Sequence, residues 1–289
     1  MLTDHELKLK SVQYRRKLLA IIKAANAGHT GGDLSCIDIL NVLYNGVLNV
    51  SPDTFTSPDR DRYIQSKGHS AEALYVVLAD RGFFPEDDLN TLAQYGSKFT
   101  GHPTRKVPGV EHNTGALGHG MSVSVGIAIA GKKDGRSYRV YTLVGDGELD
   151  EGSNWEASLL AAHYRLDNLV VIVDRNTLQI TGRTEDVLAL EPLAQKLADF
   201  GYSVRSVDGH DIAELTDALQ RAPFEADKPS LILARTVKGK GVSFIENVAA
   251  WHHRAPSDEE FEAAMRELDA AEARLASEAP GESGAIGCG

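Results

Sequence analysis

Apolar runs of strand length alternate with helix-like segments in the second half of the chain, and this alternation constrains the fold most. The predicted strands span residues 139–144, 169–173, 202–207 and 230–235, and the intervening helices span residues 153–164, 191–199 and 211–221. Strands that are apolar along their whole length and separated by helices indicate a parallel sheet buried on both faces. We therefore predict an α/β fold with three layers, α/β/α, and a mainly parallel sheet.

The rest of the chain adds mainly helices to this frame. Helical spacing of apolar residues predicts helices at residues 4–25, 33–48, 119–132 and 257–277. A short strand at residues 62–65 precedes a loop, and Ser70 is expected to cap a helix that runs to Leu78. No internal repeat or linker divides the chain, so we assign residues 1–276 to one domain. Residues 277–289 form a Gly-rich tail that we expect to be disordered.

Composition excludes several classes of function. The 289 residues carry a formal net charge of −11, whereas a nucleic-acid-binding surface needs a basic excess, so no nucleic acid partner is expected. No apolar stretch is long enough to span a membrane, and the N-terminus lacks a signal pattern. The two cysteines, Cys36 and Cys288, do not make a disulfide framework. We therefore expect a cytoplasmic protein without a membrane partner.

Two polar residues follow the ends of neighbouring predicted strands. Asp146 lies between two glycines after the strand at 139–144, and Asn176 follows the strand at 169–173. In an open parallel sheet the carboxyl ends of the strands are where ligands bind. Carboxylate, amide and backbone carbonyl oxygens, together with phosphate oxygens, are the usual ligands of Mg²⁺. Asp146, Asn176 and the Leu178 carbonyl are therefore candidate metal ligands, and Gly147 offers a backbone N–H to a diphosphate. The alternative is ordinary turn chemistry, for which Gly-Asp-Gly is also common.

Histidines recur in small loops along the chain. His29, His69 and His102 each follow a glycine, and His252 follows Trp251. A single histidine of this kind is more often structural than catalytic, and the spacing does not match a zinc site. Histidines beside strand ends are suited to bind sugar hydroxyls and to move protons near neutral pH.

Taken together, these motifs resemble the transketolase family in identity and order, over nearly the whole chain. The matching segments are Ala27-Gly28-His29, Lys67-Gly68-His69-Ser70, Thr100-Gly101-His102-Pro103, Asn113-Thr114-Gly115-Ala116-Leu117-Gly118-His119-Gly120, Gly145-Asp146-Gly147, Glu151-Gly152, Asn176, Thr236-Val237-Lys238-Gly239-Lys240-Gly241 and Trp251-His252. The resemblance implies the thiamine diphosphate-binding fold, with thiamine diphosphate and Mg²⁺ as cofactors.

The resemblance also implies a role for individual residues. His69 would contact the cofactor diphosphate region, and the backbone at Gly115 and Leu117 would bond the aminopyrimidine. His29 and His252 would face the sugar near its C3 hydroxyl, and His102 would lie near the C1 hydroxyl. Glu151 would be a buried carboxylate that communicates with the activating glutamate, and Lys238 a basic residue near the cofactor. Lys67 is also expected at the site. The family often has Gly-Lys where this chain has His253-Arg254, which leaves the substrate contacts at that rim open.

Only the first of the family's three domains is represented. The resemblance therefore implies the N-terminal subunit of a split transketolase, which transfers a two-carbon ketol unit between a ketose and an aldose, or their phosphates. A separate subunit would carry the pyrimidine-binding and C-terminal domains in an α2β2 assembly. The alternatives are a split enzyme that forms 1-deoxyxylulose 5-phosphate or another acyloin, and a non-catalytic cofactor-binding module.

Overall fold

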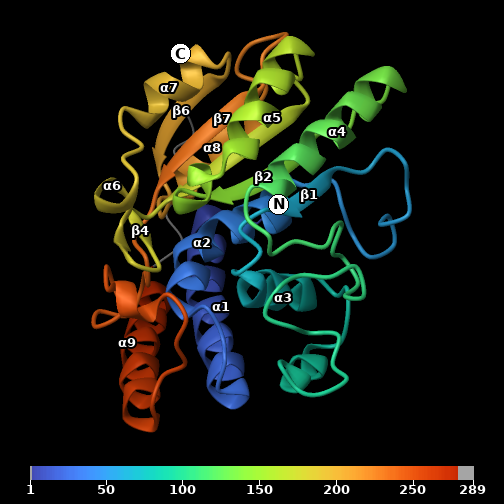
Figure 1. The fold of residues 1–289 in the computed structure, drawn as a ribbon. Helices are drawn as coiled ribbons and strands as arrows, with labels where there is room; N and C mark the ends of the chain where they lie inside the picture. The colour runs from blue at the N-terminus through green and yellow to red at the C-terminus, as the bar shows by residue number, and fades with distance from the viewer. Residues whose placement is uncertain (1, 279–289) are drawn as a thin grey trace, which may run out of the picture.

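A five-stranded parallel sheet forms the middle layer of the protein (Figure 1). The computed structural model describes residues 2–278. The strands lie in the order β1 (Arg62–Gln65), β2 (Val140–Gly145), β3 (Leu169–Arg175), β7 (Ser230–Arg235) and β6 (Ser203–Asp208). Every neighbouring pair is parallel. The predicted mainly parallel sheet is confirmed.

Helices cover both faces of the sheet because alternate strand residues point to opposite sides. Tyr141 and Leu143 of β2 pack into the core formed with α1 (Asp4–Ala25), α2 (Thr30–Val42), α3 (Ala71–Asp80) and α8 (Ile212–Gln220). Val140 and Val144 pack into the core formed with α4 (His119–Lys133), α5 (Gly152–His163) and α7 (Leu193–Asp199). The long helix α9 (Asp258–Ser277) lies beside α1 (Figure 1). The three-layer prediction is therefore confirmed.

Some local expectations were wrong. The helix expected at 33–48 begins at Thr30 and ends at Val42, and a π-helical turn, Leu43–Val47, follows it. Ser70 precedes α3 as expected, but its side chain makes no capping hydrogen bond. Short elements that lack a periodic pattern were not predicted. They are the antiparallel pair β4 (Leu178–Gln179) and β5 (Gly182–Arg183), α6 (Thr184–Val187), and 3-10 helices at Glu86–Thr91, Gly147–Asp150 and Ala249–Trp251.

Residues 279–289, which make up most of the expected tail and include Cys288, lie outside the described part of the chain. The assignment of one domain and a disordered tail stays a prediction. Within residues 2–278, no helix combines the length and the apolar character that crossing a bilayer requires.

Candidate functional site

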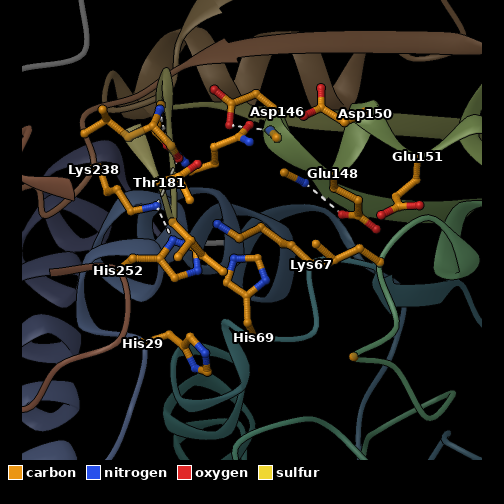
Figure 2. Close-up of a pocket in the computed structure, with 18 of the residues that line it drawn as sticks. His29, Lys67, His69, Asp146, Glu148, Asp150, Glu151, Thr181, Lys238 and His252 are labelled. Carbon is orange, nitrogen blue, oxygen red and sulfur yellow. Dashed lines mark hydrogen bonds between the residues drawn. The ribbon is translucent and has the colours of Figure 1, made fainter. Parts of the chain in front are cut away.

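A cavity of about 470 Å³ opens at the carboxyl ends of β1, β2, β3 and β7. Each of these strands is followed by a segment that lines the cavity, so residues distant in sequence meet there. All the side chains and backbone positions predicted for the site line it: His29, His69, His102, Gly115, Leu117, Asp146, Gly147, Glu151, Asn176, Leu178, Lys238 and His252. Figure 2 shows histidines on one side of this cavity and the carboxylates of Asp146 and Glu148 on the other.

Oxygen atoms gather where β2 and β3 end. The Asp146 carboxylate is buried and accepts the backbone N–H groups of Gly147, at 2.9 Å, and Thr177, at 2.5 Å. The Asn176 amide oxygen accepts the N–H of Leu178 at 3.1 Å. Burial raises the pKa of Asp146, and the nearby Asp174 adds to this effect. A buried carboxylate beside amide and carbonyl oxygens is a donor set that suits Mg²⁺.

A cation already contacts one of the predicted metal ligands. The Lys238 ammonium donates to the Leu178 carbonyl at 3.1 Å and to Nδ1 of His252 at 3.0 Å (Figure 2). Burial lowers the pKa of Lys238 to about 8, and the Lys67 charge contributes. An ammonium has no acceptor, so a neutral His252 must carry its proton on Nε2. Lys238 therefore supplies positive charge and fixes the tautomer of His252.

Four predicted histidines converge in the cavity. The ring of His29 lies 5.5 Å from that of His69, and 5.8 Å from those of both His102 and His252, measured between centroids. The rings of His69 and His252 stack at 5.2 Å. A β-bridge between His29 and Arg254 joins the two chain segments that carry His29 and His252, and the Thr30 hydroxyl donates to the Arg254 carbonyl at 2.6 Å.

All four histidines are neutral at physiological pH. Burial lowers the pKa of His29 to about 3, with help from His253 and His102. Burial and the Lys238 charge lower the pKa of His252 to about 3. The pKa values of His69 and His102 are also lowered, in both cases chiefly by burial. A neutral imidazole has one N–H donor and one acceptor nitrogen, so the cluster is suited to form hydrogen bonds with the hydroxyl groups of a bound sugar.

The expected burial of Glu151 is not found within this chain. Glu151 precedes α5 and its side chain is exposed, although it lines the cavity. Glu148 is the buried carboxylate, because the Gly147–Asp150 turn folds it under the strand ends. It accepts hydrogen bonds from the Ser66 hydroxyl at 2.5 Å, Gly118 N–H at 2.9 Å and Gly145 N–H at 3.0 Å.

Lys67 lines the cavity, but its ammonium serves a structural contact. Its Nζ forms an ion pair with Asp174, and both side chains are fully buried. The same ammonium donates to the Gly32 carbonyl at 3.1 Å, so it joins the β1 loop, β3 and α2. The site role expected for Lys67 is therefore indirect.

Close backbone contact explains one glycine in the motifs. A Cβ built on Gly68 would lie 2.5 Å from the Gly115 nitrogen, so any side chain there would separate the His69 loop from the Gly115 loop. The glycine before His69 thus allows two walls of the cavity to meet.

Several residues of the cavity and its rim were not predicted as site residues from the sequence. Gln179, Ile180 and Thr181 reach the cavity from the β4–β5 hairpin, which has no periodic signature. His253 lies 4.5 Å from His29 between ring centroids and lines an adjoining hollow. Its position next to His252, in place of the family's usual glycine, is the signal that pointed to it.

Comparison with known proteins shows which family this chain resembles over most of its length. Residues 8–274 match the family described as the thiamine diphosphate binding domain of transketolase. Two similar proteins are named as subunits of apulose-4-phosphate transketolases. The one from Actinobacillus succinogenes is 49% identical, over 92% of this chain and 97% of its own length. The one from Phocaeicola vulgatus is 46% identical, over 91% and 93%.

Among solved structures, the transketolase of Campylobacter jejuni superposes with a TM-score of 0.85 at 32% identity. The match covers 95% of this chain but only 46% of that transketolase, so the chain spans less than half of the solved enzyme. The two apulose-4-phosphate transketolase subunits are instead matched over nearly their full length. The chain belongs to the transketolase family, as its thiamine diphosphate-binding domain, and resembles the N-terminal subunits of split members.

Proposed function

We propose that this chain is one subunit of a thiamine diphosphate-dependent transketolase, active only with a separate partner chain. The reaction moves a two-carbon ketol unit from a ketose to an aldose. The observation that carries the proposal is the convergence of four neutral histidines with the oxygen donors of Asp146 and Asn176 in one cavity. A cofactor-binding module without catalysis needs the oxygen donors but not the histidines.

The residues present fit the cofactor and Mg²⁺. Asp146, Asn176 and the Leu178 carbonyl would hold the metal, and Gly147 and His69 would hold the diphosphate, with Lys238 adding positive charge. Gly115 and Leu117 would bind the aminopyrimidine through their backbone. When bound, thiamine diphosphate supplies the nucleophilic carbon and the electron sink needed to cleave a bond beside a ketose carbonyl.

The histidines would position the sugar and move its protons. His252, with its proton on Nε2, would donate a hydrogen bond to the C3 hydroxyl oxygen. Nδ1 of His29 is buried and without a hydrogen-bond partner among the described residues. Because Nδ1 of His252 already accepts from Lys238, we propose that His29 receives the C3 hydroxyl proton as the carbon–carbon bond breaks, while His252 holds the hydroxyl oxygen. We propose that His102 binds the C1 hydroxyl.

The partner chain would complete the site. The similar proteins are themselves named as subunits, and Glu151 is exposed beside the cavity, where a second chain can cover it. We propose an α2β2 complex, located in the cytoplasm, that takes part in carbohydrate metabolism. A phosphorylated ketose related to apulose 4-phosphate is the substrate class that the names of these relatives suggest.

Purification of the tagged chain from its host, with mass spectrometry of co-purifying proteins, tests the proposal. We expect a stoichiometric chain with a pyrimidine-binding domain, Mg²⁺-dependent binding of thiamine diphosphate, and ketose cleavage by the complex. Cofactor binding without cleavage, with the partner present, would instead identify a binding module. Acceptance of pyruvate as the donor would favour an acyloin-forming enzyme.

A further inference from the structure

Two buried acidic residues lie directly behind the histidine cluster and outside the cavity. Asp33 is in the first turn of α2, four residues after His29, and Glu72 is in the first turn of α3, three residues after His69. Asp33 is 0% exposed and Glu72 is 1% exposed. Carboxyl groups are rarely buried this completely unless a partner or a proton removes their charge.

A proton would satisfy the two buried oxygens of this pair that lack a donor. Oδ1 of Asp33 accepts the Ala73 N–H at 3.0 Å, so Asp33 caps α3 in place of Ser70. Because Ala73 directly follows Glu72, this contact brings the Asp33 carboxyl group beside the α3 turn that carries Glu72. The second oxygen of Asp33, Oδ2, and the Oε2 of Glu72 are both buried and have no hydrogen-bond partner among residues 2–278, so each is left without a donor. Two carboxylates are acceptors only, and a hydrogen bond between them exists only if one is protonated.

We propose that Asp33 and Glu72 share a proton and, as a positioning pair, join the helix ends that carry His29 and His69. The shared proton gives the α2–α3 contact a hydrogen bond without placing a second charge in the core. The two histidine rings that these segments present lie 5.5 Å apart. Loss of the proton would set two buried carboxylates against each other and separate the two segments.

No neighbouring cation in the described part of the chain substitutes for this proton. Lys67 is the charged group that faces the pair, but its ammonium is already paired with Asp174. Cys36 on α2 and Tyr75 on α3 are the other titratable neighbours, and burial raises the pKa of both, which keeps them neutral. Burial likewise raises the pKa of Asp33 to about 7 and that of Glu72 well above its ordinary value.

The pH dependence of stability follows from these directions. The unfolded carboxyl groups release their protons near pH 4. In the folded chain the pKa of Asp33 is about 7 and that of Glu72 lies well above its ordinary value, so the pair keeps its shared proton between about pH 4 and pH 7. The pair therefore lowers stability progressively as pH rises through that window. Glu72→Gln supplies an amide N–H to Asp33, removes one of the two titrating groups and keeps the side-chain volume.

The test compares thermal unfolding of the full chain and its Glu72→Gln variant from pH 5 to pH 8.5. The Tm of the variant should rise relative to that of the wild type as pH increases, because roughly half or more of the pair's pH dependence is removed. Glu86→Gln, at an exposed glutamate paired with Lys17, is the matched control and should leave the profile unchanged. A Tm difference between wild type and Glu72→Gln that is constant across pH would overturn the proposal.

A second measurement separates positioning from packing and requires no enzymatic activity. The infrared band of a protonated carboxyl group should be present in the wild type at pH 7.5 and diminished in Glu72→Gln. Glu72→Leu, which offers no donor to Asp33, should shift the NMR ring signals of His29 and His69, whereas Glu72→Gln should restore them. Equal shifts in both variants would show that only packing is involved. The infrared and NMR results do not depend on whether the chain proves to be active in the transketolase assay.

Discussion

Replacement of Lys67 by methionine tests the ion pair beneath the cavity. Methionine keeps most of the side-chain length, so the main loss is the ammonium. Asp174 would then remain fully buried without its countercharge. It would keep neutral donors in the Ser35 hydroxyl at 2.6 Å, the Asn176 amide at 3.2 Å and the Thr236 hydroxyl.

The magnitude follows from these contacts. Removing one partner of a buried pair costs about 3–5 kcal/mol, because the remaining charge is uncompensated. The Gly32 carbonyl also loses a donor, which adds about 1 kcal/mol, while the neutral donors to Asp174 reduce the total. We therefore expect a loss of about 3–4 kcal/mol in the free energy of unfolding, which lowers Tm by roughly 10 °C at this chain length.

Urea denaturation of four proteins measures this effect. They are the wild type, Lys67→Met, Asp174→Leu and the double variant. The double variant buries no unpaired charge, so its loss should be smaller than the sum of the two single losses. A loss below about 1 kcal/mol for Lys67→Met, or additive single losses, would show that the pair does not stabilise the floor of the cavity.

Three further predictions concern the cavity itself. Asp146→Ala should abolish Mg²⁺-dependent binding of thiamine diphosphate in calorimetric titrations, and retained binding would exclude the metal assignment. His252→Ala should leave cofactor binding intact but slow donor cleavage by about 10²–10⁴-fold in stopped-flow assays with the partner, and unchanged cleavage would remove it from the mechanism. Lys238 has a folded pKa of about 8, below the ordinary 10.5, so it loses its proton as pH rises through about 8. Cofactor affinity should then fall with rising pH. The contribution of Lys238 to the free energy of unfolding should instead rise between about pH 8 and 10.5. Lys238→Met should remove the first effect in calorimetric titrations and the second in thermal unfolding.

The regular parts of the fold were predictable because burial leaves a pattern in the sequence. The strand expected at 139–144 is β2, Val140–Gly145, and the strand expected at 169–173 is β3, Leu169–Arg175. Both are buried at every position, which the continuous apolar runs required. The meeting of Asp146 and Asn176 followed from the parallel order of these strands, since parallel strand ends lie at one edge.

The remaining site features depend on tertiary contacts that leave no such pattern. The burial of Glu148 rather than Glu151 depends on a 3-10 turn that only the folded chain shows. The partner of Lys67 lies 107 residues away, so neither its charge nor its neighbours in sequence indicate the pair. Asp33 and Glu72 look like ordinary first-turn acidic residues, which are common because they favour a helix N-terminus.

Substitutions should be tolerated less well at the floor of the cavity, where Glu148 lies, than at its rim. The reason is the set of hydrogen bonds that Glu148 accepts. Glu148 binds segments that begin after β1, before α4 and within β2, so a substitution at the floor disturbs three parts of the chain together. The β4–β5 hairpin exposes Ile180 at 72%, and it bonds to the strand ends through the backbone of Leu178, which does not depend on its side chains. Mutations at this hairpin can therefore reshape the opening at little cost in stability. Directed evolution of this chain toward new sugars should accumulate its successful mutations on the hairpin and at His253, and leave the floor unaltered.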